Sequence, residues 1–207
     1  MKVLLVNGSP HKDGCTARAL EEIANTLSEC GVESEIFHIG TDPIAGCSGC
    51  MACATLHKCR IDDLVNVFVE KAKDFDGFVF GSPVHYASAA GALAAFMDRV
   101  FYSDKCGHSN NFATKPAAAI VSARRGGTTA ALDQLNKYFG ISAMPIITST
   151  YWNMVHGNTP DQVEQDLEGL RTMRNLARNM AWFLKMKEAA GIPAPKYEYK
   201  PSTNFIR

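Results

Sequence analysis

Residues 2–16 read KVLLVNGSPHKDGCT, and this stretch indicates the fold more directly than any other part of the sequence. Residues 2–6 form an apolar run of strand length that stops at the strong turn signal of residues 8–10. From residue 16 to residue 28 the apolar positions recur at helical spacing, and Gly31 supplies a C-terminal stop. The chain therefore opens with a strand, a loop and a helix.

The same alternation continues along the chain. Further strands are predicted at residues 32–39, 77–81, 117–121 and 144–150, and further helices at 62–72, 90–101, 128–139 and 160–187. Five strands alternating with five helices predict a parallel sheet with helices on both faces. We expect one domain over residues 1–190. The prolines after Gly191 then predict an extended arm over residues 191–207.

The bulk composition narrows the classes of function. The chain has 207 residues, of which 46% are hydrophobic, and its 21 Lys and Arg residues balance its 21 Asp and Glu residues. A chain without net charge gives no electrostatic support to nucleic acid or an anionic membrane as a partner. We read neither a signal peptide nor an uncharged apolar window of spanning length, so we expect a cytoplasmic protein.

Three loops follow predicted strands whose carboxyl ends share one edge of the sheet, where ligands bind in such folds. Residues 8–16 offer glycines, hydroxyl groups and a helix N-terminus for a phosphate, although any strand-to-helix turn can use these residues. Residues 82–86 place His85 and Tyr86 where they can face a planar ring, although Tyr86 could simply cover the core. Residues 122–128 offer two glycines and two cations, which can tune a cofactor's redox potential.

A fourth loop, residues 40–60, contains the spacing Cys47-x2-Cys50-x2-Cys53-x5-Cys59. Four thiolates are what a [4Fe-4S] cluster requires. Zinc could use the same ligands, and free thiols or an adventitious disulfide are a third alternative. A disulfide framework is not expected in a cytosolic chain, because the cytosol keeps thiols reduced.

Five stretches together resemble the NADPH-dependent FMN reductases and the related iron-sulfur flavoproteins. They are VNGSPHKDGCTA (residues 6–17), CSGCMACATLHKCRIDDL (47–64), GFVFGSPVHYASAAGALAAFMDR (77–99), VSARRGG (121–127) and TNFIR (203–207). The resemblance implies a flavodoxin-like three-layer α/β/α sandwich whose five parallel strands have the order 2-1-3-4-5. It also implies bound FMN.

Carried over position by position, the resemblance assigns cofactor-binding residues to the three loops. They are Ser9, His11, Cys15 and Thr16 for the phosphate, Pro83, Val84, His85 and Tyr86 for the isoalloxazine ring, and Ser122, Arg124, Gly126 and Gly127 for its pyrimidine side. His11, Cys15 and His85 depart from the residues that the family more often shows. The four loop cysteines resemble the compact cluster motif of the iron-sulfur flavoproteins, whereas similar FMN reductases keep several of them without a metal.

The expected activity is hydride transfer from NADH or NADPH to FMN, followed by transfer to a small-molecule electron acceptor or a redox protein. No protein residue is expected to be catalytic, because the cofactor does the difficult chemistry. The competing hypothesis is an electron carrier with a [4Fe-4S] cluster on Cys47, Cys50, Cys53 and Cys59. A flavin-free binding protein on the same fold is a third class. The resemblance also implies a homodimer or homotetramer.

Overall fold

The computed structural model describes residues 1–198 and 203. The closing stretch at residues 204–207 and the part of the expected arm at 199–202 lie outside the described residues. Residues 191–198 carry no regular secondary structure. Among the described residues, no helix combines the length and the apolar character that spanning a bilayer requires.

A central parallel sheet has the strand order β2-β1-β3-β5-β6. Its members are β1 (Lys2–Asn7), β2 (Glu33–His38), β3 (Gly77–His85), β5 (Ala117–Ala123) and β6 (Met154–His156). A two-residue strand, β4 (Ser88–Ala89), pairs with β3 in antiparallel orientation. Counted among the parallel strands alone, this order is the predicted 2-1-3-4-5, which confirms the flavodoxin-like fold. The additional short strand, β4, was not predicted.

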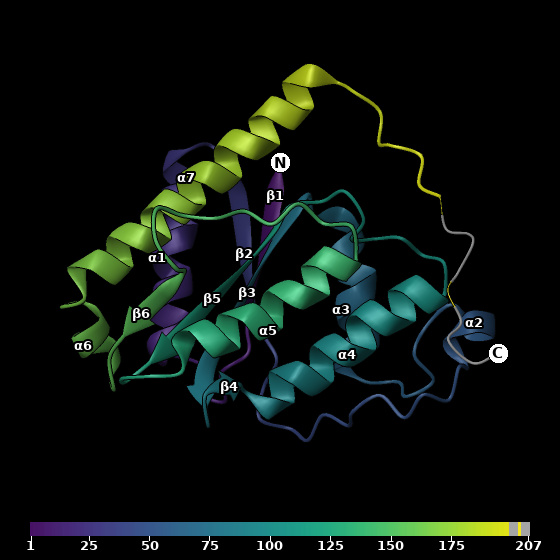
Figure 1. Cartoon of the computed structure of the whole chain (residues 1–207), viewed down its shortest axis with the longest axis horizontal. Coiled ribbons are helices and arrows are strands. Elements are labelled where there is room, and N and C mark those ends of the chain that lie inside the picture. The colour runs from purple at the N-terminus through teal and green to yellow at the C-terminus, as the bar shows by residue number, and fades with distance from the viewer. Residues whose placement is uncertain (199–202, 204–207) are drawn as a thin grey trace.

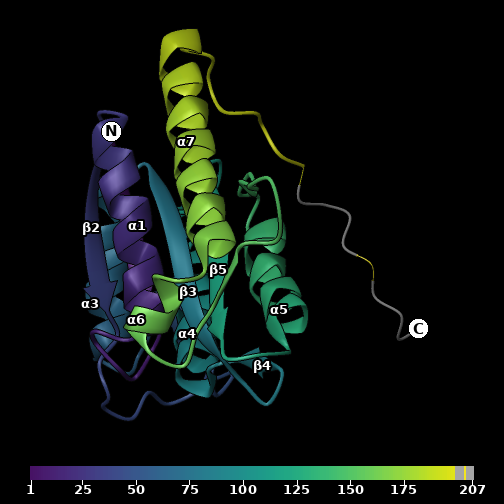
Figure 2. The same cartoon turned by 90° about the vertical axis from the view of Figure 1, so that its left-hand side faces the viewer.

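Two helical layers cover the sheet (Figures 1 and 2). One layer contains α1 (Cys15–Glu29), α6 (Pro160–Val163) and α7 (Leu167–Ala190), and the other contains α3 (Leu64–Lys71), α4 (Gly91–Cys106) and α5 (Thr128–Ile141). A short helix, α2 (Cys53–Leu56), and a 3₁₀ turn, η1 (Ala72–Asp74), complete the second side.

Each face of the sheet has its own apolar core because successive side chains of a strand point to opposite faces. In β1, Leu4 and Val6 pack into the core under α3, α4 and α5, together with a cluster of phenylalanines. Val3 and Leu5 pack into the core under α1 and α7. All four side chains are fully buried, which explains the continuous apolar run at the start of the sequence.

The predicted strand at residues 144–150 is wrong. Ile146 makes only an isolated bridge to Ala117, and the regular strand is β6. In the segment between Ile146 and β6, polar side-chain contacts replace the regular hydrogen bonds of a strand. Asn179 of α7 donates a hydrogen bond to the Thr148 carbonyl, and the Asn153 side chain takes the place of a ladder partner by donating to the Ala119 carbonyl at 3.0 Å.

The predicted helix at 160–187 is two helices, since Asp166 interrupts it. Its carboxylate accepts hydrogen bonds from the Gly169 and His156 backbone N–H groups at 2.9 and 2.7 Å, and its backbone leaves the helical region. Asp166 thereby starts α7 and also fixes the end of β6. The loop between β6 and α6 is held in place as a result.

Candidate functional site

Asn7, the last residue of β1, holds the first loop from beneath. It is buried, its amide nitrogen donates to the Lys12 carbonyl at 3.0 Å, and its amide oxygen accepts from the Ser9 N–H at 3.0 Å. The Ser9 hydroxyl accepts from the His11 N–H at 3.1 Å, and the His38 Nε2 lies 2.8 Å from the Ser9 carbonyl. Sequence reasoning missed Asn7. Its signal was a single polar residue closing an otherwise apolar strand.

The same loop ends at the N-terminus of α1. Gly14 is the N-cap, no described side chain caps this end, and the first turn carries no acidic residue. The first N–H groups of a helix have no intrahelical acceptor, and the helix dipole makes this end attractive to anions. This donor set fits the phosphate of FMN.

The second loop is a hairpin, not the simple strand end that the sequence predicted. β3 runs to His85 and turns back into β4, pairing Val84 with Ala89 and His85 with Ser88. The two turn residues, Tyr86 and Ala87, both have positive φ, of 49° and 58°. Such φ values are typical of two-residue hairpin turns. Tyr86 is fully exposed, at 106%.

The third loop joins the first through a pair of hydroxyl groups. Thr16 Oγ1 at the start of α1 and Ser122 Oγ near the end of β5 lie 2.9 Å apart, and both side chains are buried. Gly127 joins the third loop to the second. Its φ is 94°, and a Cβ there would lie 2.7 Å from Ala87 Cα and 2.9 Å from Val84 Cγ1. Only glycine allows the two loops to approach this closely.

These three loops and the β6–α6 loop surround one cavity of about 530 Å³. Its lining residues are Ser9, His11, Asp13, Gly14, Cys15, Thr16, Pro83, Val84, His85, Ser122, Ala123, Arg124, Gly157, Asn158, Thr159 and Pro160. This volume is in the range of cofactor pockets. Of the predicted cofactor-binding residues, all line the cavity except Tyr86, Gly126 and Gly127.

Sequence reasoning missed the cavity's fourth wall, residues 157–160. This segment follows β6, and the misplaced last strand hid its position. A signal was present, because Thr159 caps α6 through its side chain and Pro160 occupies the first turn, as at many strand-to-helix junctions. The Cys15 thiol donates to the Gly157 carbonyl at 3.5 Å. Burial raises the pKa of the Cys15 thiol, so at neutral pH it is an uncharged donor beside the phosphate position.

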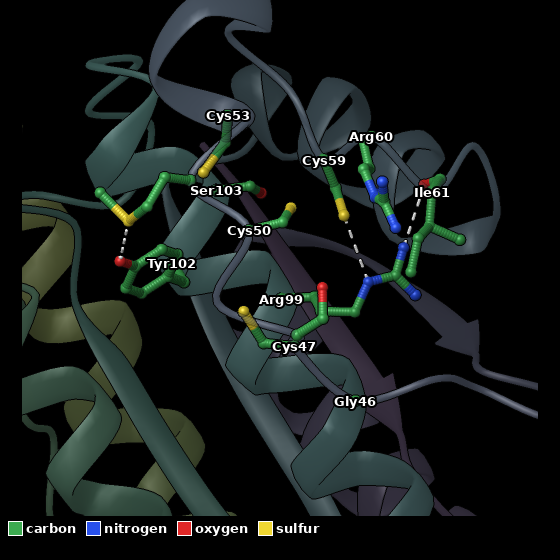
Figure 3. A pocket seen from close by; sticks show the side chains of 12 residues that line it. Gly46, Cys47, Cys50, Cys53, Cys59, Arg60, Ile61, Arg99, Tyr102 and Ser103 are labelled. Atoms are coloured by element: carbon green, nitrogen blue, oxygen red, sulfur yellow. Dashed lines mark hydrogen bonds between the residues drawn. The ribbon is translucent and has the colours of Figure 1, made fainter.

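A second hollow lies in the cysteine loop (Figure 3). All four predicted ligands, Cys47, Cys50, Cys53 and Cys59, line it together with Arg99 of α4. Cys47 and Cys50 are exposed, whereas Cys53 is buried. Soft thiolates are the ligand class that iron-sulfur clusters use, so the donor set fits such a cluster in its chemistry.

All seven cysteines lie in the described part of the chain, and all are free thiols. Within the described residues, no group of three or more His, Cys, Asp or Glu side chains is arranged to hold a metal ion. The side-chain arrangement therefore supports neither zinc nor an iron-sulfur cluster by itself, and the case for a cluster depends on the number and the chemistry of the thiols. Burial and the neighbouring Cys106 raise the pKa of Cys53 to about 11, which keeps this thiol protonated in the metal-free loop.

The adjacent residues Asp98 and Arg99 serve different elements. The Asp98 carboxylate accepts a hydrogen bond from the Tyr138 hydroxyl of α5. Arg99 is directed to the opposite side, where its guanidinium pairs with Asp63 at 2.6 Å. Both contacts lie within the subunit, in agreement with the structural role that their place in an apolar helix suggests.

Comparisons with known proteins agree with this arrangement. The family model described as NADPH-dependent FMN reductase matches residues 1–159. An iron-sulfur flavoprotein of Methanocaldococcus jannaschii is 30% identical over 191 residues, covering 90% of this chain and 98% of the relative. An iron-sulfur flavoprotein of Archaeoglobus fulgidus is 27% identical over 201 residues, covering 88% and 97%.

Solved structures extend the likeness in fold. RosB with bound 8-demethyl-8-formylriboflavin-5'-phosphate has a TM-score of 0.72 and 13% identity, over 100% of this chain and 95% of that chain. A flavone reductase has a TM-score of 0.69 and 18% identity, over 92% and 65%. At this identity the structures show the fold alone. The family model, the long relative and the cavity together show that the chain belongs to the NADPH-dependent FMN reductase family and is an FMN-dependent oxidoreductase.

Proposed function

We propose that the protein takes a hydride from NADH or NADPH into bound FMN and passes the electrons to a small-molecule acceptor. The observation that carries this proposal is the cavity of about 530 Å³ at the carboxyl edge of the sheet, which brings together loops more than a hundred residues apart in sequence. A cavity open on one side gives a nicotinamide and then an acceptor access to the same place. When bound, FMN supplies the hydride acceptance and the electron donation.

The chain's own residues bind, orient and tune. The uncapped N-terminus of α1 and the hydroxyl groups of Ser9 and Thr16 would hold the phosphate. Residues Pro83, Val84 and His85 would form one wall for the ring. Arg124 brings a cation to the cavity, and a cation at the pyrimidine side stabilises negative charge on a reduced ring. Gly126 and Gly127 would act on the ring indirectly, by setting the path of the loop.

The test is reduction of the purified, flavin-loaded protein by NADH and by NADPH, followed anaerobically at the flavin absorption maximum. We expect stoichiometric uptake of FMN, bleaching by at least one nicotinamide, and re-oxidation by a quinone or a nitro compound. Protein that takes up no FMN would overturn the proposal, and so would FMN-loaded protein that neither nicotinamide reduces.

A second candidate function is that of an electron carrier with a [4Fe-4S] cluster on Cys47, Cys50, Cys53 and Cys59. Two observations favour it: all four thiols line one hollow, and the long curated relatives bear the name iron-sulfur flavoprotein. Anaerobically purified protein is then expected to contain iron, sulfide and FMN. Cys50→Ser should lose the iron and keep the FMN, whereas Cys30→Ser, at the end of α1 and away from the hollow, should keep both.

We further propose that residues 1–190 fold as one FMN-binding domain with an arm at 191–207, in a cytoplasmic homodimer or homotetramer. Exposed aromatic side chains, Tyr151 and Trp152 before β6 and Trp182 on α7, support association with a second copy. Light scattering coupled to size exclusion measures the state directly. A monomer at micromolar concentration would contradict this part of the proposal.

A further inference from the structure

Arg99 is the largest fully buried side chain in the described part of the molecule, at 1% exposure. Its guanidinium donates to the Asp63 carboxylate at 2.6 and 2.8 Å and to the Ile61 carbonyl at 3.0 Å. It also donates to the Cys59 sulfur at 3.3 Å and to the Ala45 carbonyl at 3.4 Å. A buried charge is tolerated only when it is paired and hydrogen-bonded, and these five contacts meet that requirement.

The partners of Arg99 lie on both sides of the cysteine spacing. Ala45 comes just before Cys47, and residues 59–63 follow the last gap, so one guanidinium ties the entry of the loop to its exit. The contacts come from the apolar helix α4, whose residues Arg99, Tyr102 and Ser103 line the hollow (Figure 3). A planar fork with five N–H groups can make these contacts together, which a lysine ammonium cannot.

Cys59 is held at both its backbone and its sulfur. Asn66 of α3 fixes its backbone from both sides, accepting from the Cys59 N–H at 3.0 Å and donating to the Cys59 carbonyl at 2.9 Å. Arg99 fixes its sulfur. Cys47 and Cys50, in contrast, are exposed. The loop therefore has one anchored thiol and two exposed thiols facing the same hollow.

We infer that Arg99 is a positioning residue for an iron-sulfur cluster, which anchors Cys59 as a ligand and donates a hydrogen bond to its sulfur. The inference rests on the proposed cluster. Groups that hydrogen-bond to metal ligands orient them and change their basicity. An N–H donor to a ligating sulfur offsets negative charge, favours the reduced cluster and raises its reduction potential.

The experiment compares anaerobically purified wild type with Arg99→Lys, which keeps the charge and loses the fork. We expect Arg99→Lys to keep its FMN, to release iron to a chelator about 10-fold faster, and to shift the cluster's reduction potential to a more negative value in a titration followed by electron paramagnetic resonance. Arg178→Lys is the control, because Arg178 lies on α7 and does not line the hollow. Its potential should not change.

Asp63→Asn separates positioning from stability. It breaks the ion pair with Arg99 but keeps a good N-cap for α3, and it leaves the donor to Cys59 in place. We expect it to lower the stability of the protein as Arg99→Lys does while leaving the potential near that of wild type. A wild type with FMN but without iron and sulfide would overturn the cluster proposal and this inference together. A wild type with a cluster whose potential is unchanged in Arg99→Lys would overturn this inference alone.

Discussion

Replacing Gly127 with alanine perturbs the point where the second and third loops meet. The new methyl group would lie 2.7 Å from Ala87 Cα and 2.9 Å from Val84 Cγ1, closer than non-bonded carbons approach. Both atoms belong to the hairpin that forms one wall of the cavity. Gly127 is also the N-cap of α5 and has a φ of 94°, so the backbone there cannot relax easily for an L-residue.

The magnitude follows from two costs and one gain. A non-glycine residue at positive φ costs about 1–2 kcal/mol, and overpacking costs about 1–3 kcal/mol. Restricting the unfolded chain returns about 0.4–1 kcal/mol. We therefore expect Gly127→Ala to lower the free energy of unfolding by about 1–5 kcal/mol. The protein can relieve part of this strain by moving the two loops apart, which distorts the cavity. Each 1.4 kcal/mol needed to restore the cavity weakens FMN binding about 10-fold.

Urea unfolding measures the first effect, and quenching of FMN fluorescence on binding measures the second. Gly140→Ala, in the same helix and outside the cavity, provides the control, because a Cβ at Gly140 would meet nothing within 4 Å. We expect Gly140→Ala to bind FMN as wild type does and to be no less stable. If the two variants lose the same amount of stability and affinity, or if Gly127→Ala loses neither, the close contact between the loops does not shape the cavity.

Three further predictions address other contacts. Thr16→Val removes a hydroxyl group that we propose holds the phosphate and should weaken FMN binding by about 10-fold or more, because a hydrogen bond to a charged group contributes about 1.5–3 kcal/mol; a fluorescence titration measures the affinity. Glu22 is partly buried, but hydrogen bonds from two arginines outweigh burial and lower its pKa below 4.5. The ionised Glu22 carboxylate therefore stabilises the fold above about pH 4.5, and this stabilisation is lost as the pH falls through the folded-state pKa. Glu22→Gln should be less stable than wild type at pH 7. In urea titrations it should also lose less stability than wild type as the pH is lowered. Tyr86→Gly should raise the unfolding free energy by about 0.5–1 kcal/mol, since it removes positive-φ strain at a fully exposed side chain.

Each of these three predictions has a control or a result that would contradict it. Thr26→Val removes another buried hydroxyl from α1, one that bonds only to its own helix, and should leave FMN affinity unchanged. Parallel acid profiles for wild type and Glu22→Gln would argue that the two arginines do not hold this carboxylate ionised. A loss of stability in Tyr86→Gly would indicate that the tyrosine ring makes contacts that its exposure does not suggest.

Local patterns were sufficient to predict a parallel sheet and most of the cavity, whereas the strand order came from the family resemblance. Each strand of the parallel core is a short apolar run followed by a polar or glycine-rich turn, and in such a sheet all these turns reach the same edge. Residues 8–16, 82–86 and 122–128 could therefore be assigned to one site before any contact was known. The four cysteines were also evident from spacing alone.

The remaining features depend on tertiary contacts. Each contact joins residues far apart in the chain, and the local sequence around one residue does not indicate the other. The segment at 144–150 was predicted as a strand, yet only Ile146 makes a bridge to the sheet, and Asn179 of α7 bonds to the Thr148 carbonyl. The turn of the hairpin at Tyr86, with its positive φ and its full exposure, was not evident from the sequence. Arg99 reads as part of an apolar helix, and only folding brings its guanidinium to both ends of the cysteine loop, 36 and 54 residues away. Burying that charge is favourable only where several acceptors converge, and such convergence is a property of the folded chain.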